Sequence, residues 1–210
     1  MSTYAQLQSD IADWLMRSDL TDVIPTFITN GESRINKRIR HRLMEQTDTL
    51  AFDQNGVGTL PSDFLEVRSL EVVHDGLRVP LEHIEPDSAE WLFKHRPSQP
   101  KYFTLVAENA VTRPLFSGTG TLNYYARLPA LSNAEPTNWL LEKFPEVYLY
   151  GALIEGAVYL RDQPLLAHFA DLFNDATQGV LTDKRLSRIT RAEAPPAAMS
   201  AETRDQLKAV

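Results

Sequence analysis

The sequence predicts an α+β fold in which helices from both ends of the chain form one bundle and a β-sheet is inserted between them. Apolar residues recur at helical spacing in residues 3–42 and again in residues 139–190. Residues 43–138 instead contain short β-rich runs separated by turn signals. We therefore expect a helical bundle from 1–42 and 139–190, an inserted antiparallel β-rich domain from 43–138, and an extended C-terminal tail from 191–210.

Two helices are expected in the first region. Thr3 is suited to cap the first helix, with Gln6 completing a capping box, and residues 18–22 (SDLTD) break the helical pattern. The second helix should begin between Asp22 and Pro25, because proline is tolerated only in the first turn of a helix. The apolar face of this second helix comprises Phe27, Ile28, Gly31, Ile35 and Ile39.

The second helix ends in the most charged stretch of the chain, RINKRIRHR at residues 34–42. Because Ile35 and Ile39 face the core, the cations must project outward or sideways. Their position also suits the negative end of the helix dipole. They are Arg34, Lys37, Arg38, Arg40 and Arg42. Two interpretations stay open: a solvated helix end, or an interface patch that meets an acidic protein surface or passing DNA.

The middle region is expected to form an antiparallel sheet of about five or six strands. The β-rich runs are 47–52, 64–73, 77–84, 101–107, 110–116 and 121–128. Asp75-Gly76 is a hairpin signal, and residues 85–95 are expected to form a short inserted helix. Residues 117–121 (SGTGT) are expected to be a hairpin turn, because a phosphate-binding loop needs a helix after its glycines.

The third region is expected to hold a helical segment over 138–162 that is buried on several sides, with a break or kink at Pro145. Four small residues in it allow another helix to approach closely: Gly151, Ala152, Gly156 and Ala157. Glu155 is expected to pair with an arginine, either Arg161 or one on the second helix. The last helix, at about 164–189, ends in a second basic cluster of Lys184, Arg185, Arg188 and Arg191.

Composition excludes several classes of function. A net charge of −7 disfavours general binding to nucleic acid, and the absence of cysteine excludes disulfides, thiolate nucleophiles and Cys-type zinc sites. Neither a signal peptide nor an apolar run of roughly 20 residues is present, so we expect a soluble protein made in the cytoplasm. The five histidines are scattered, and each is expected at the surface or in a turn. No catalytic motif appears, so neither an enzyme nor a cofactor is expected.

The tail has a composition that does not favour independent folding. Residues 192–210 contain Pro195-Pro196, six alanines and few large hydrophobic residues. Such a segment buries too little apolar surface to offset the entropy of ordering. We expect it either to be disordered or to become ordered on a partner.

Three segments carry a resemblance to a known family. They are LPSDFLEVRSL (60–70), YYARLPALS with the following PTNWLL (124–141), and YLYGALIEGAVYLRD (148–162). In this order, within a collinear match over about residues 3–175, the chain resembles the head-to-tail adaptor family of tailed bacteriophages (connector, or tail tubular protein A-like). None of the three segments is a catalytic motif, so the resemblance implies a structural role.

The resemblance implies a homo-oligomeric ring of twelve subunits in the virion neck, between capsid and tail. Such a ring docks on the portal protein, extends the DNA channel and offers a platform for tail nozzle or tail completion proteins. The helical bundle would lie beside the portal and the sheet toward the tail. Double-stranded DNA would pass without specific binding.

The basic residues of 34–42 and of 184–191 would then lie at subunit or portal interfaces. The C-terminal tail would grip the portal through residues such as Pro195, Pro196, Met199 and Leu207. The alternative is a nucleic-acid-binding accessory or regulatory protein that uses the basic helix end at 34–42. A steep salt dependence of tight binding would favour this alternative.

Overall fold

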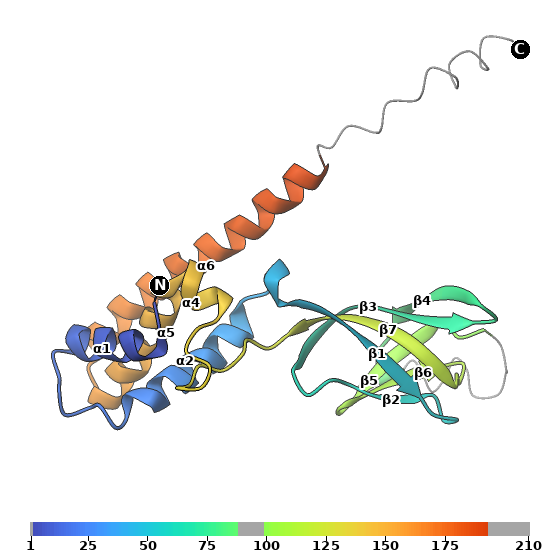
Figure 1. Cartoon of the computed structure of the whole chain (residues 1–210), viewed down its shortest axis with the longest axis horizontal. Coiled ribbons are helices and arrows are strands. Elements are labelled where there is room, and N and C mark those ends of the chain that lie inside the picture. Colours follow the sequence, from blue (N-terminus) through green and yellow to red (C-terminus); the bar gives the residue numbers. More distant parts are fainter. Residues whose placement is uncertain (1, 88–98, 193–210) are drawn as a thin grey trace, which may run out of the picture.

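The computed structural model of the chain describes residues 2–87 and 99–192, with side chains up to residue 183. The molecule is elongated, with helices gathered in one lobe and strands in the other (Figure 1). The helical lobe contains α1 (Tyr4–Leu15), α2 (Ile24–Arg38), α4 (Trp139–Lys143), α5 (Pro145–Leu160) and α6 (Gln163–Ala192). The sheet lobe contains β1 (Glu45–Phe52), β2 (Val57–Thr59), β3 (Phe64–His74), β4 (Leu77–His83), β5 (Tyr102–Val106), β6 (Asn109–Arg113) and β7 (Gly118–Ala126). The predicted α+β class is confirmed.

The first two helices form where the sequence predicted them. The Thr3 side chain accepts a hydrogen bond from the Gln6 backbone N–H and so caps α1. The predicted capping box is wrong, however, because no hydrogen bond among the described residues joins the Thr3 N–H to the Gln6 side chain, which instead donates to Asp10 one turn further on. The predicted break at 18–22 separates α1 from α2, and the predicted apolar face of α2 is buried.

The centre of the helical lobe is α5, which packs against α1, α2 and α6. The predicted break at Pro145 is confirmed, since α4 ends at Lys143 and α5 begins at the proline. Gly31 of α2 lies directly against the backbone of Gly151 and Ala152. The small residues therefore allow the close helix contact that the sequence predicted.

The sheet differs from the prediction in two respects. It has seven strands in the order β1-β7-β3-β4-β5-β6-β2, because the very short β2 lies between the first two predicted β-rich runs and was not predicted as a strand. It is also mixed rather than antiparallel, since Glu82 of β4 lies opposite Tyr102 of β5 in a parallel pair. Residues 84–101 make this pairing possible, because parallel neighbours need a long crossover connection. The helix expected over 85–95 lies largely outside the described residues.

Glycines have two different roles in the sheet. Asp75 and Gly76 have φ values of 50° and 78° and form the predicted hairpin turn between β3 and β4. The prediction of a turn at 117–121 is wrong, because this segment lies mainly inside β7. A Cβ at Gly120 would lie 2.9 Å from both the Glu71 carbonyl oxygen and the Phe52 ring. Gly120 therefore serves close packing in a strand rather than a turn.

Each lobe has its own hydrophobic core. The sheet core includes alternate residues of β3, such as Leu70 and Val72, together with Leu122 of β7. The helical core runs from Leu7 and Ile11 of α1 through α2 and α5 to Phe173 of α6. The sheet is therefore inserted between the helices in the sequence, whereas in space the helices from both ends of the chain pack together in a separate lobe.

Candidate interaction surface

Two of the predicted basic residues, Arg34 and Arg38 of α2, bind side chains of other helices in the same chain. Arg34 donates to the Glu155 carboxylate of α5, so the predicted pairing of Glu155 is made with α2 and not with Arg161. Arg38 donates to the Asn174 side chain of α6, and its guanidinium lies 5.7 Å from the centre of the Phe173 ring. These two arginines connect α2 to α5 and α6.

Arg40 connects the two lobes. Its Nε donates to Glu66 of β3 at 2.6 Å, while Nη1 donates to the carbonyls of Asn36 and Ile39 at 2.6 and 2.8 Å. A cation at these carbonyls satisfies acceptors at the end of α2 and complements the helix dipole. Arg40 therefore has a structural function at the junction between α2 and the sheet.

Lys37 and Arg42 are exposed, and their side chains make no hydrogen bond or ion pair with any residue that the structure describes. They are the members of the predicted patch that are available to a partner. The second basic cluster occupies the last turns of α6, at Lys184, Arg185, Arg188 and Arg191, where only the helix itself is described. The predicted tail residues Pro195, Pro196, Met199 and Leu207 lie outside the described residues.

His41 is buried, with only 1% of its surface exposed, and the prediction of a surface or turn position is wrong for this histidine. Its ring stacks on Trp139 with centres 5.1 Å apart. Nδ1 accepts the Leu43 N–H at 3.3 Å, so Nε2 carries the proton and donates to Asp183 of α6 at 3.0 Å. His41 thus connects the α2–β1 linker to α6, the helix that extends beyond the helical lobe in Figure 1.

Polar side chains of α2 also hold the chain that returns from the sheet. Asn36 accepts the Leu128 N–H at 3.0 Å, and Glu32 accepts the Leu131 N–H at 2.8 Å. The two side chains are one helical turn apart, so they face the same returning segment. Nothing in the sequence pattern indicated these contacts, because Glu32 and Asn36 resemble ordinary polar positions of a surface helix.

Glu32 belongs to a buried polar network. Tyr148 donates to Glu32 at 3.5 Å and accepts from the Asn138 amide at 2.6 Å. The Asn138 side-chain oxygen in turn caps α4. Burial raises the pKa of Glu32 above its ordinary value, and burial with the nearby Glu32 carboxylate raises the pKa of Tyr148.

Replacing Glu32 by glutamine is expected to change how stability depends on pH. Because the pKa of Glu32 in the folded protein is raised above 4.5, folding favours the protonated form of this side chain. The contribution of the proton to the free energy of unfolding is full below pH 4.5 and is lost as the pH rises through the pKa of the folded state. The stability of Glu32→Gln relative to the natural protein should therefore increase between pH 4 and pH 7. Urea unfolding at several pH values measures this difference, with Glu142→Gln on the exposed surface of α4 correcting for the loss of one charge. A Glu32→Gln difference independent of pH would contradict the prediction.

Two register shifts in β3 shape the sheet side of the junction. They leave Leu65 and Arg68 as extra residues opposite β7. Leu65 packs against the helical core, and Arg68 forms an ion pair with Glu45 while lying 5.5 Å from the centre of the Tyr125 ring. These irregularities turn side chains of the sheet toward the helical lobe, so the two lobes share packing at the junction.

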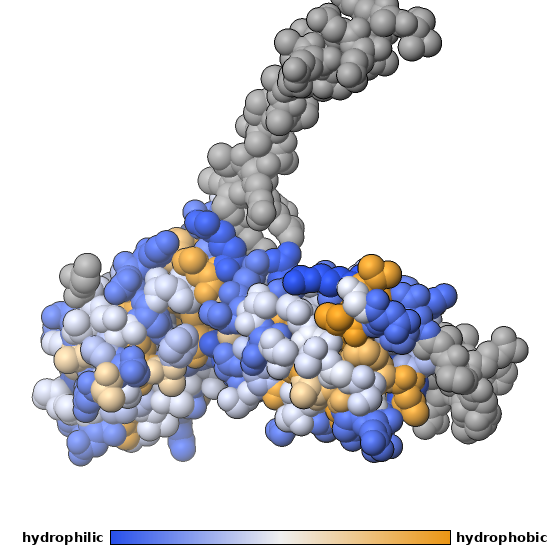
Figure 2. Space-filling model, turned by 45° about the vertical axis from the view of Figure 1, so that its right-hand side comes forward, coloured by the Kyte–Doolittle hydropathy of each residue, from blue (hydrophilic) through white to orange (hydrophobic). Residues whose placement is uncertain are grey.

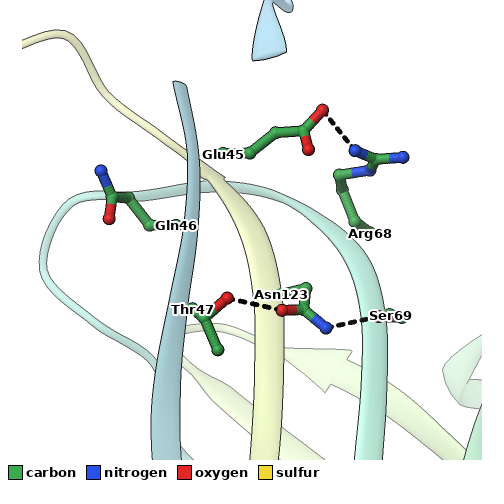
Figure 3. A pocket seen from close by; sticks show the side chains of 6 residues that line it. All are labelled: Glu45, Gln46, Thr47, Arg68, Ser69 and Asn123. Carbon is green, nitrogen blue, oxygen red and sulfur yellow. Dashed lines mark hydrogen bonds and ion pairs between the residues drawn. The ribbon is translucent and has the colours of Figure 1, made fainter. Parts of the chain in front are cut away.

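The same strands carry a shallow polar pocket of about 340 Å³. Its lining comprises Glu45, Gln46, Thr47, Arg68, Ser69 and Asn123 (Figure 3). Thr47 donates to the Asn123 side chain, which donates to Ser69, and Glu45 pairs with Arg68. Because these polar groups satisfy one another across three strands, the pocket has the character of a solvated sheet face and not of a catalytic site.

Large hydrophobic residues are exposed in separate places rather than in one belt. On the view in Figure 2, hydrophobic atoms form islands among hydrophilic ones. The most exposed are Met16 at the end of α1 (89%), Leu77 at the β3–β4 hairpin (69%) and Leu115 after β6 (58%). These residues lie on the helical lobe and on the sheet lobe, which places apolar contact points on both.

Within the described part of the chain, no group of three His, Asp or Glu side chains is arranged to hold a metal ion. None of the helices in that part is long and apolar enough to cross a bilayer.

Comparison with known proteins agrees with this description. No curated protein matches the chain. The family model described as SU10 adaptor protein matches residues 2–199, which is nearly the whole chain. The predicted resemblance to phage head-to-tail adaptors is thereby confirmed, and this family is structural rather than catalytic. The chain belongs to the SU10 adaptor protein family of phage head-to-tail adaptors.

Proposed function

We propose that the chain is the subunit of a twelve-membered ring that docks on the portal of the capsid and joins the head of the phage to its tail. The membership in an adaptor family carries this proposal. In the virion neck, the ring extends the DNA channel and offers attachment sites for tail nozzle or tail completion proteins. The proposed division is a bundle of residues 1–42 and 139–190, an inserted β-rich domain of 43–138, and a tail of 191–210.

The shape of the subunit supports contacts in two directions. The sheet lobe lies at one end of the molecule, while α6 extends beyond the helical lobe along its own line (Figure 1). A helix that leaves the body after its last packed turns obtains further stabilisation from a partner. We assign the portal to α6, with Lys184, Arg185, Arg188 and Arg191 as contact residues and Pro195, Pro196, Met199 and Leu207 as the gripping tail. The sheet lobe is left to face the tail proteins.

The nucleic-acid alternative has less support from the geometry. Three of the five basic residues in 34–42 are engaged within the chain: Arg34, Arg38 and Arg40. Among the described residues of this stretch, Lys37 and Arg42 are left to neutralise phosphates, against a net charge of −7 for the chain. We propose that double-stranded DNA passes through the ring without specific binding.

Electron microscopy of the full chain mixed with its portal protein tests the proposal. The expected result is a cap with twelve-fold symmetry on each portal ring. Absence of a complex, or a cap of a different symmetry, would overturn the ring of twelve. A filter-binding titration serves as the second measurement: tight DNA binding near physiological salt with a steep salt dependence would support the nucleic-acid alternative instead.

A further inference from the structure

We propose that neighbouring copies in the ring meet through the outer face of α2 on one copy and the outer face of α6 on the next, with Lys37 placed between Asp171 and Asp175. This inference rests on the proposed assembly of identical copies and names the surfaces that make it. The occupant of each face is a second copy of this chain.

The stretch of residues 24–42, which includes α2, and the part of α6 before its basic cluster carry opposite charge. Residues 24–42 contain five cations and one acid, the buried Glu32. Residues 163–183 contain three acids and neither lysine nor arginine. Within the chain, Asp183 is already engaged by His41. Asp171 and Asp175 are exposed, and their side chains have no hydrogen bond or ion pair with any described residue, as is also true of the Lys37 side chain.

Both outer faces are regular helix surfaces. On α6 the buried positions Phe169, Phe173, Thr177 and Val180 face the lobe, and the exposed positions 171, 175, 178 and 182 recur on the opposite side. On α2 the exposed positions 26, 29, 33 and 37 likewise lie away from the buried ones. The charges on these faces that lack partners among the described residues therefore point away from their own chain.

Three hydroxyl side chains on these faces already donate hydrogen bonds within their own helix. Thr29 and Ser33 of α2 donate to carbonyls of their own helix, at 3.1 and 3.2 Å, and Thr182 of α6 does the same at 2.9 Å. Their hydroxyl donors therefore remain satisfied when a neighbour covers the surface, and the usual penalty for burying an unpaired donor is avoided.

Lys37 of α2 lies at the same position along the helix axes as Asp171 and Asp175 of α6. Arg38 contacts Phe173 and Asn174, so the last turn of α2 lies level with this part of α6. Lys37 is one residue earlier, a difference of about 1.5 Å along the helix. The helices α2 and α6 run in the same direction (Figure 1). A rotation about an axis parallel to them preserves height, so it brings Lys37 of one copy level with Asp171 and Asp175 of the next.

The proposed contact uses a different surface on each of the two copies, so variants of one surface can be combined with variants of the other. Lys37→Glu alone and Asp171→Lys/Asp175→Lys alone should each weaken self-association by about tenfold or more, because like charges then face each other. An equimolar mixture of the two variants should restore association. In an alternating ring, one contact then pairs Lys37 with Asp171 and Asp175, and the next pairs the introduced glutamate with the two introduced lysines. Sedimentation over a range of concentrations at low salt measures the association of each sample.

A cysteine trap provides the second measurement. The chain has no cysteine of its own. Ser33 and His168 lie on the two faces at nearly the same height, and neither is one of the paired charges. Oxidation of Ser33→Cys/His168→Cys should give a ladder of covalent oligomers, whereas either single variant should give no ladder beyond dimer.

The outcomes separate this inference from the proposed ring. Variants that associate as well as the natural chain, a mixture that stays dissociated, or a double cysteine variant without a ladder would each overturn the α2–α6 contact and leave the ring on the portal standing. A natural chain that forms neither an oligomer in solution nor a cap on the portal would overturn the ring itself, and the contact with it.

Discussion

Gly31→Leu is expected to unfold or strongly destabilise the helical lobe. A Cβ at Gly31 would lie 3.1 Å from both the Ala152 nitrogen and the Gly151 carbonyl carbon, which are backbone atoms of α5. Backbone atoms in the middle of a buried helix cannot move aside as a flexible side chain can, so α2 and α5 must separate. We expect a loss of about 3 kcal/mol or more in the free energy of unfolding.

Gly179→Leu is the matched control. Gly179 lies in α6, where nothing is within 4 Å of the position of a Cβ. Leucine there should leave stability unchanged or raise it by up to about 1 kcal/mol, because glycine is a poor helix former. Urea unfolding of dilute protein, followed by circular dichroism, compares the two variants. Equal effects of the two substitutions would show that helix propensity, and not the close α2–α5 contact, decides the outcome.

His41→Ala is expected to produce the second large effect. The substitution removes a buried ring from its stack with Trp139 and leaves Asp183 and the Leu43 N–H without their partner. Loss of packing together with two hydrogen bonds should cost about 3 kcal/mol of unfolding free energy. Because the contact with Asp183 ties this part of α6 to the buried His41, hydrogen exchange of the amides just before Asp183 should also accelerate.

His168→Ala is the control for this experiment, since His168 is an exposed residue of the same helix. Its effect on stability should be within about 0.5 kcal/mol. If His41→Ala is as mild as His168→Ala, or if exchange in α6 does not change, then the His41–Asp183 contact does not anchor the helix. A large loss of stability together with faster exchange in α6 would show that the buried side chain of His41, in the α2–β1 linker, holds α6 in place.

The basic patch of residues 34–42 is best tested at positions whose side chains do not stabilise the fold. A charge reversal at Arg38 would disturb its contacts with Asn174 and Phe173, so loss of assembly in such a variant would be mixed with loss of stability. Lys37 and Arg42 have no such contacts among the described residues. Substitutions at these two positions therefore report on partners with little effect on the fold.

The sequence alone determined the class of fold and the family. Local signals decide where helices and turns begin: Thr3 caps α1, Pro145 starts α5, and Asp75-Gly76 closes a hairpin. Such signals act between residues close in the chain, and so they can be interpreted without knowledge of the rest. The adaptor resemblance followed from three collinear segments and was confirmed over residues 2–199.

Only the tertiary structure decided which charges are available and how the sheet is paired. Whether Arg34 meets Glu155 or solvent depends on residues 121 positions apart in the chain. The burial of His41 against Trp139 and the parallel pairing of β4 with β5 likewise depend on long-range contacts. A pattern of hydrophobic and charged residues specifies which face of an element is buried, but the partner of a side chain is set by the packing of elements that are distant in sequence. For this reason the sequence predicted a basic patch of five residues, and the described part of the structure leaves two of them for a partner.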